Sequence, residues 1–244
     1  MKKILNILLI AVMIVTLAAC GGKKEEEKKV IYVGTNAEFP PFEYLEDGKI
    51  TGFDMELIEE IAKESEMEIK IEDMSFDGLL PALQSKKVDV VIAGMTANEE
   101  RKKAVNFTSP YYTASQVIVV KKGDNSINSF DDLKGKKVGV MLGFTGDLVV
   151  SEIEGVTVER YNAAYSGIMA LQSDKVDAVV LDSEPAKNYV DKNEGLEIAK
   201  ADAAEEEYAI AVRKEDKELL EKLEVGLKAV KDKGVYEELL KKYF

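Results

Sequence analysis

Histidine is absent from this 244-residue chain, and cysteine occurs only once, as Cys20. Without histidine there can be no His-based catalytic triad, no His proton shuttle and none of the common catalytic zinc sites. A single cysteine cannot pair within the chain, so no internal disulfide supports the fold. We therefore expect neither a metal nor a cofactor.

Positive charge is scarce relative to negative charge, because 33 Lys and Arg side chains face 46 Asp and Glu side chains. The resulting net charge of -13 repels nucleic-acid phosphates, so we expect no nucleic-acid partner. Hydrophobic residues make up 46% of the chain, which rules out wholesale disorder. The length is sufficient for one large domain or two lobes, each with its own core.

Long apolar runs are also lacking, apart from Ile4–Ala19 at the N-terminus. This run is shorter than the ~20 residues of a transmembrane span and follows two lysines, which predicts a signal peptide over residues 1–19. Small residues lead directly into Cys20, which resembles a bacterial lipobox and implies cleavage before this cysteine and acylation of its thiol. An ordinary signal peptide with an incidental cysteine is the alternative. Residues 20–29 are highly charged and indicate a solvated tether.

The remaining chain alternates between strand and helix patterns. Val30–Val33 is a short run rich in β-branched residues, Ile69–Ile71 is expected to be a strand, and Val88–Ala93 is apolar except for Asp89 and suits a strand buried on both faces. Between them, the spacing of apolar residues predicts a helix to about Glu64 with Asp54 as its N-cap. Such alternation favours an α/β fold with a mainly parallel sheet.

Part of this pattern is repeated. Residues 82–91 recur 88 positions later as residues 170–179, with eight of ten positions identical. Helix–turn–strand joints can resemble one another by chance, but the matching flanks favour two homologous lobes, each a sheet flanked by helices. Ligands of open α/β sheets bind beyond the carboxyl ends of the strands. We therefore expect Gly94 and Asp182, which follow the repeated strands, to face each other across a cleft between the lobes.

The loops at this expected cleft carry groups suited to an α-amino acid. Thr96 and Glu99 have the spacing of a capping box, and the amides at a helix start attract anions. Arg101 offers a planar fork for a carboxylate, and residues 140–147 form a second strand–glycine–helix entry. Asp182 can accept from an ammonium group. Together these groups predict an anion site and an ammonium acceptor in one cleft.

Three segments then resemble the polar amino-acid-binding proteins of bacterial ABC importers, solute-binding protein family 3. They are VGTNAEFPPFEY (residues 33–44), GFD (52–54) and ERKKAVNFTSPYY (100–112). The resemblance covers Val30 to Phe244 and implies a two-lobe fold of the periplasmic-binding-protein type II class, with two hinge crossovers near 111–115 and 206–210. It implies a first lobe of residues 30–112 and 209–244 and a second lobe of residues 113–208.

The resemblance also implies roles for individual residues. Arg101 matches the family arginine that binds the α-carboxylate, Asp182 matches the α-ammonium acceptor, and Phe39 and Phe53 match the aromatic walls around the ligand side chain. For the two phenylalanines, ordinary core packing is the alternative. The implied ligand-binding set is Asn36, Glu38, Phe39, Phe53, Ala93, Gly94, Met95, Thr96, Arg101, Met141, Phe144, Thr145, Gly146 and Asp182. The chain departs from some relatives at Met141, Leu142 and Phe144, where polar, basic or small hydroxyl residues occur.

The resemblance implies a monomeric receptor that is lipid-anchored outside the cytoplasm. It would close on a free amino acid and deliver it to an ABC permease. An enzyme on the same scaffold, similar to cyclohexadienyl dehydratases, is the alternative and would need Glu38, Asp182 or Glu184 as its acid. A signalling ectodomain is less favoured, because it would normally continue into a transmembrane segment.

The side-chain end of the expected cleft offers acidic and aromatic groups. Glu38 provides a charge partner for a cation, and the faces of Phe39 and Phe53 favour cation–π stacking. No second Arg or Lys is matched to this end, so an acidic ligand would lack a counter-charge. We therefore expect lysine or arginine first, an uncharged polar amino acid such as glutamine or histidine second, and glutamate or aspartate last.

Overall fold

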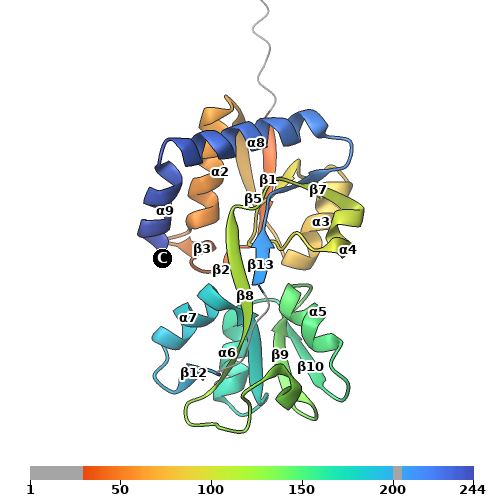
Figure 1. Ribbon diagram of the computed structural model, residues 1–244, viewed down its shortest axis with the longest axis vertical. Coiled ribbons are helices and arrows are strands. Elements are labelled where there is room, and N and C mark those ends of the chain that lie inside the picture. Colours follow the sequence, from red (N-terminus) through yellow and green to blue (C-terminus); the bar gives the residue numbers. More distant parts are fainter. Residues whose placement is uncertain (1–29, 200–204) are drawn as a thin grey trace, which may run out of the picture.

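The computed structural model describes residues 30–199 and 205–244, which form two lobes along the long axis of the molecule (Figure 1). The expected signal peptide, Cys20 and the charged tether lie outside the described residues. Each lobe is a sheet flanked by helices, as expected for an α/β fold. Within the described ranges, no helix has both the length and the apolar character needed to cross a bilayer.

The first lobe is built on a five-stranded sheet with the order β5-β1-β6-β14-β7. Strand β1 pairs in parallel with β5 and β6, whereas β14 is antiparallel to β6 and β7. The elements of this sheet and its helices are β1 (Val30–Thr35), α2 (Phe53–Glu64), β5 (Glu68–Asp73), α3 (Phe76–Gln84), β6 (Val90–Val91), α4 (Glu99–Ala104), β7 (Val105–Phe107), β14 (Ala211–Arg213), α8 (Lys217–Asp232) and α9 (Val235–Tyr243). A small second sheet comprises β2 (Glu38–Phe39), β3 (Glu43–Glu46) and β4 (Lys49–Thr51).

The second lobe is built on a sheet with the order β10-β9-β11-β8-β12. Strand β9 pairs in parallel with β10 and β11, and β8 is antiparallel to β11 and β12. Its elements are β8 (Tyr112–Lys121), the 3-10 helix η1 (Phe130–Leu133), β9 (Lys137–Met141), α5 (Thr145–Ser151), β10 (Thr157–Tyr161), α6 (Ala164–Gln172), β11 (Ala178–Asp182), α7 (Ser183–Asp191) and β12 (Leu196–Ile198).

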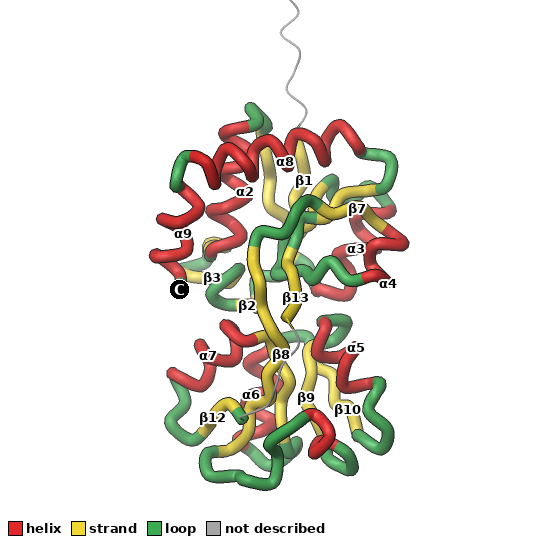
Figure 2. Tube along the Cα trace, viewed as in Figure 1, coloured by secondary structure: helices red, strands yellow, loops and turns green. Residues whose placement is uncertain are grey.

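Two antiparallel segments connect the lobes. Strand β13 (Glu205–Tyr208) pairs with the first residues of β8, and the two strands run side by side between the lobes (Figure 2). Tyr208 lies opposite Tyr112 at one end of this pairing, and Glu205 lies opposite Ser115 at the other. These are the segments in which the sequence places the two crossovers, and we call them the hinge strands.

The repeated sequence folds in the same way in both lobes. Lys86 and Asp174 occupy equivalent positions and both have left-handed backbone conformations. After α3, the amide of Lys87 donates to the carbonyl of Ala82 at 2.9 Å, and after α6 the amide of Lys175 donates to the carbonyl of Ala170 at the same distance. The same tight turn therefore carries each helix into its buried strand, although the left-handed residue itself differs between the copies.

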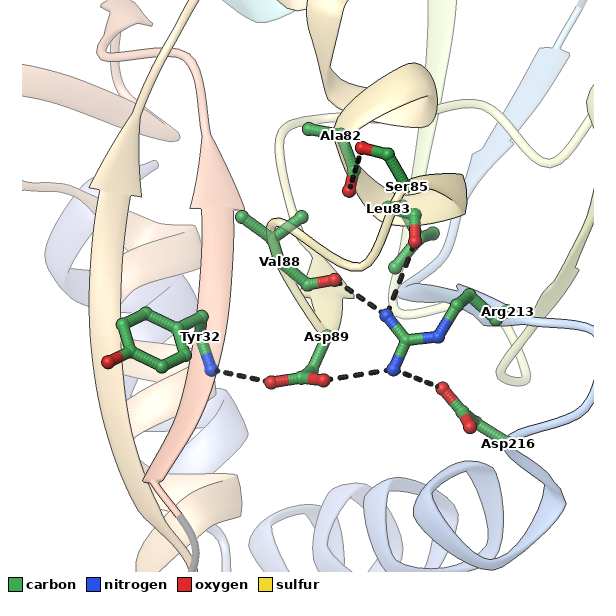
Figure 3. Close-up of polar contacts among 8 residues, drawn as sticks. All are labelled: Tyr32, Ala82, Leu83, Ser85, Val88, Asp89, Arg213 and Asp216. Carbon is green, nitrogen blue, oxygen red and sulfur yellow. Dashed lines mark hydrogen bonds and ion pairs between the residues drawn. The ribbon is translucent and has the colours of Figure 1, made fainter.

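The aspartate in each repeat also holds a neighbouring strand. Asp89 accepts a hydrogen bond from the amide of Tyr32 in β1, and Asp177 accepts one from the amide of Lys137 in β9. Only the first lobe adds a buried arginine here: Arg213 donates to Asp89 at 2.9 Å and forms an ion pair with Asp216 (Figure 3). The first copy is thus tied to β14, the strand that returns from the second lobe.

Two helix starts differ from the sequence prediction. The N-cap of α4 is Asn98, whose side-chain oxygen accepts from the amide of Arg101 at 2.8 Å, so the predicted capping box at Thr96 and Glu99 is wrong. Helix α2 begins at Phe53, so Asp54 lies within its first turn rather than capping it. In both cases the polar side chain makes a tertiary contact instead of satisfying its own helix.

Candidate ligand-binding site

The turn at Gly94, after β6, lies directly against an aromatic ring. Gly94 has φ +51°, and a Cβ atom built there would lie 2.7 Å from Cε1 of Phe39. Its amide donates to the buried carboxylate of Asp54 at 2.8 Å, and that carboxylate also accepts from the hydroxyl of Tyr111 at 2.6 Å. Burial raises the pKa of Asp54 to about 6, although both hydrogen bonds oppose this shift. Only glycine fits this turn, and Asp54 fixes its position.

Arg101 projects from α4 and contacts both lobes. Its side chain is buried, and its two terminal nitrogens donate to the carbonyl of Thr96 and to the carbonyl of Gly143 in the second lobe, both at 2.9 Å. The guanidinium carbon lies 5.2 Å from the ring centroid of Phe76. Burial lowers the pKa of Arg101, while Asp182 and Glu206 raise it. The expected carboxylate clamp therefore lies at the junction of the lobes.

The second lobe contributes the loop between β9 and α5. Gly143 has φ +77°, and its amide donates to Asp147 at 3.1 Å, which in turn pairs with Arg160. The hydroxyl of Thr145 donates to the hydroxyl of Thr96 across the lobes at 3.0 Å. The loop is thus held by Asp147 and presents its first helical residues to the first lobe.

Asp182 ends β11 and is almost completely buried. It accepts a short hydrogen bond from the hydroxyl of Tyr208, a residue of the hinge strand β13. Burial and the nearby carboxylate of Glu206 raise the pKa of Asp182 to about 7, whereas Tyr208, Gln116 and Arg101 act in the opposite direction. A buried carboxyl group in this setting is stabilised in its charged form by an added cation.

Three phenylalanine rings meet between the lobes. Phe144, at the start of α5, stacks on Phe76 with ring centroids 3.6 Å apart and lies 5.1 Å from Phe39. Phe76 begins α3, at the carboxyl end of β5. Phe39 and Phe144, both members of the expected ligand-binding set, therefore lie together, and Phe76 joins them although the sequence did not single it out.

Phe53 is placed elsewhere, and its expected role as a wall of the pocket is not supported by its surroundings. Its ring is fully buried and packs on Tyr236, Tyr243 and Phe244 from the C-terminal helix region. The motif that contains it begins a helix whose first turn faces the lobe core. Core packing, the alternative interpretation, describes Phe53.

The other expected residues lie around this centre in different settings. Asn36, Ala93, Met95, Met141 and Gly146 are all buried. The side-chain amide of Asn36 donates to the carbonyl of Met74 at 3.0 Å. A Cβ atom on Gly146 would lie 2.8 Å from Oε1 of Gln116, so the start of α5 packs closely on the hinge strand β8.

Glu38 is exposed and lies at the rim rather than in the buried centre. It lines a pocket of about 420 Å³ together with the β2–β3 region of the first lobe and Tyr189 and Lys192 of the second. Partial burial raises the pKa of Glu38, and the charge of Asp73 adds to this effect. Asp73 itself accepts from the amide of Ala37 at 2.9 Å. The pocket at this rim thus carries the carboxylates of Glu38 and Glu46 and the ammonium group of Lys192, and Asp73 lies close enough to act on Glu38.

The hinge strands supply site residues that sequence reasoning missed. Gln116 of β8 and Glu206 of β13 both lie next to Asp182, and Tyr208 donates to it directly. Glu206 and Tyr208 fall within the crossover expected near residues 206–210, whereas Gln116 lies one residue beyond the crossover expected near 111–115. A further signal existed for Phe76, which follows β5 just as Gly94 follows β6 and is succeeded by Asp77 and Gly78.

Two lobes joined by two hinge strands, with polar and aromatic residues gathered between them, are the architecture of a two-lobe solute-binding protein. Residues 31–244 match the family Bacterial extracellular solute-binding proteins, family 3, and the chain belongs to this family. The family is extracellular, which places the protein outside the cytoplasm.

Several relatives are similar over nearly the whole described chain. An arginine-binding extracellular protein of Bacillus subtilis (strain 168) is 42% identical over 222 residues, 88% of this chain and 86% of its own length. A crystal structure of a mutant arginine-binding protein of T. maritima has a TM-score of 0.85 at 46% identity and covers 88% of this chain and 95% of its own. An ancestral arginine-binding protein bound to arginine has a TM-score of 0.85 at 47% identity, with 88% and 98% covered.

These relatives confirm the two-lobe α/β fold and the solute-binding function expected from the sequence. They are named as binding proteins, and the dehydratase alternative finds no support among them. The protein is therefore an extracellular solute-binding protein of family 3.

Proposed function

We propose that the protein binds a basic α-amino acid, with L-arginine first, by closing its lobes around it. The observation that carries this proposal is an excess of hydrogen-bond acceptors at the site. Among the described residues, Oδ1 of Asn36 and Oε1 of Gln116 are buried without a hydrogen-bond partner, and Asp182 lies buried beside the carboxylate of Glu206. Unpaired buried acceptors are costly, so they favour a ligand rich in donors.

Arginine supplies these donors at both of its ends. Its ammonium group would pair with Asp182, its carboxylate with Arg101, and its guanidinium would lie against the rings of Phe39, Phe76 and Phe144. The relatives named as arginine-binding proteins support the same ligand class. One neighbour, an ancestral arginine-binding protein, is bound to glutamine, which supports an uncharged polar amino acid as the second choice.

A thermal-shift screen of the twenty amino acids, followed by calorimetry, tests the ligand. We expect arginine to raise the melting temperature most, because a ligand that binds only the folded state stabilises it by mass action. Glu38→Gln should weaken lysine or arginine binding more than glutamine binding, since it removes charge from the rim. A wild-type protein that binds glutamate best would contradict the charge argument.

We also propose that Cys20 carries a lipid that anchors the receptor beside its ABC permease. The apolar segment and the small residues before Cys20 support this proposal. In a bacterial host, the full chain should partition into detergent and Cys20→Ser should be released from the membrane after processing. Equal partitioning of both forms would argue against lipid attachment. Sedimentation of the mature body with and without arginine tests the expected monomer.

A further inference from the structure

Glu206 lies on the hinge strand β13 beside the loop that precedes α4. Its two neighbours in sequence, Glu205 and Glu207, are exposed, whereas Glu206 is half-buried. The backbone of this strand is bonded to the loop on both sides of Thr96: the amide of Ala97 donates to the carbonyl of Glu207 at 2.9 Å, and the amide of Ala209 donates to the carbonyl of Met95 at 3.1 Å. The hinge strand and the Thr96 loop are therefore held in register.

The side chain of Glu206 fixes the polarity of the Thr96 hydroxyl. Thr96 donates its hydroxyl proton to Oε2 of Glu206 at 2.7 Å. A threonine hydroxyl has one proton to donate, so its oxygen can now act only as an acceptor toward other groups, as it does toward the hydroxyl of Thr145. A ligand carboxylate needs donors, whereas an ammonium group needs acceptors. The contact thus suits Thr96 to an ammonium group.

Glu206 also adds charge at the same end of the site. The amide nitrogen of Gln116 lies 3.4 Å from Oε2 of Glu206, and Asp182 is close enough for the two carboxylates to interact electrostatically. Asp182 comes from the second lobe, Thr96 from the first, and Glu206 from the strand between them. An ammonium group placed among these three would be the common counter-charge of both carboxylates.

We propose that Glu206 is a specificity residue for the ligand's α-ammonium group, because it orients Thr96 as an acceptor and supplies negative charge alongside Asp182. This inference rests on the proposed binding of an α-amino acid. Hinge strand β13, which connects the two lobes, would then also take part directly in recognising the ligand's α-ammonium group.

Calorimetric titration of Glu206→Gln with L-arginine tests the proposal, with Glu207→Gln as the matched control on the same strand. We expect Glu206→Gln to weaken arginine binding roughly 10- to 100-fold, the range for a lost hydrogen bond to a charged group. Glu207→Gln should stay within about 3-fold of wild type, because its exposed side chain lies outside the site. Thermal melting of each variant checks folding. Equal affinities of the two variants would overturn the proposal.

Two further measurements separate recognition from a structural effect. In competition experiments, 5-guanidinopentanoic acid, which is arginine without its amino group, should compete about equally well for both variants. In a double-mutant cycle, Thr96→Ala and Glu206→Gln should be non-additive, whereas Thr96→Ala and Glu207→Gln should add. Additive effects, or an equal loss for arginine and its deaminated analogue, would reject the assignment. If Glu206→Gln does not fold, Glu206→Asp takes its place. It should lose some affinity for arginine, less than roughly 10- to 100-fold, and none for the deaminated analogue. An unchanged arginine affinity in Glu206→Asp would reject the proposal. A wild-type protein that binds no α-amino acid would instead refute the proposed function.

Discussion

Asp182 is the residue at which pH and ligand binding meet. Burial, with Glu206 beside it, raises its pKa to about 7, so the group is partly protonated near neutral pH. An ammonium group favours the charged form and would expel that proton. We predict that arginine affinity increases as the pH rises from about 5 to 8, with ~1 proton released at pH 6. Calorimetry in buffers of different ionisation enthalpy measures this release, and identical heats in all buffers would contradict it.

Asp182 should also make the stability of the ligand-free protein depend on pH, with lower stability at neutral and higher pH. Because the folded-state pKa lies above the ordinary value of 3.8, the folded protein holds a proton that the unfolded chain releases. This stabilising contribution is present below pH 4 and is lost as the pH rises through about 7. Asp182→Asn should therefore melt higher than wild type at pH 8 and show little gain at pH 4, while binding arginine far more weakly.

Two phenylalanines of the first lobe, Phe53 and Phe76, should separate affinity from stability. Phe76→Ala removes a ring from the interlobe cluster, so we predict an arginine affinity lower by ~0.5–2 kcal/mol. Phe53→Ala opens a hole in the core beside the C-terminal helix, so we predict a loss of ~3–5 kcal/mol in unfolding free energy. Chemical denaturation and calorimetry on both variants provide the comparison. If Phe53→Ala lost arginine affinity but kept its stability, Phe53 would be a pocket residue and not a core residue.

At the scale of elements, the equivalent aspartates of the two repeats, Asp89 and Asp177, allow the contribution of Arg213 to stability to be measured. Asp89 and Asp177 each hold the start of a neighbouring strand, but only Asp89 also pairs with the buried guanidinium of Arg213. Arg213 keeps Asp216 as its other ion-pair partner, so Asp89→Asn weakens one charge-assisted hydrogen bond and should cost ~1.5–3 kcal/mol. Asp177→Asn removes only the charge from an acceptor at an exposed position and should cost no more than ~0.5–1.5 kcal/mol. Urea unfolding of both variants gives the two values, and equal losses would mean that Arg213 adds nothing.

At the scale of the whole molecule, function depends on contacts that only a closed arrangement allows. Arg101 from the first lobe reaches the carbonyl of Gly143 in the second, and a ligand carboxylate would share this fork. A ligand stabilises closure only to the extent that it binds the closed form better. We predict that arginine decreases the radius of gyration of wild type in small-angle X-ray scattering.

The matched variant for closure is Arg101→Ala, which removes the bidentate partner of the carboxylate. We expect it to lose at least ~100-fold in affinity and to show no decrease in radius at the same arginine concentration. Circular dichroism should remain native, because the side chain mainly contacts loop carbonyls. Near-native affinity in this variant would remove Arg101 from the site.

The sequence by itself determined the features that depend on local pattern. Alternating strand and helix signals specified the α/β class, because each element follows from the spacing of its own apolar residues. The repeat of residues 82–91 at residues 170–179 specified two lobes, because the same helix–turn–strand unit occurs twice. The same repeat placed Gly94 and Asp182 at the ends of equivalent buried strands. The positions of Arg101 and Thr145 also followed, since each lies in the first turn of the helix that comes after a strand, α4 after β6 and α5 after β9.

Only the tertiary structure decided which side chains face the ligand. Phe53 and Phe76 both begin helices next to strands, yet one packs on the C-terminal helix and the other meets Phe144, because the packing of distant segments determines which face is buried. Glu206 and Gln116 are 90 positions apart in the sequence, and the pairing of β8 with β13 brings them together. Glu206 raises the pKa of Asp182 and Gln116 lowers it. Both effects depend on distance and burial, which cannot be read from spacing along the sequence.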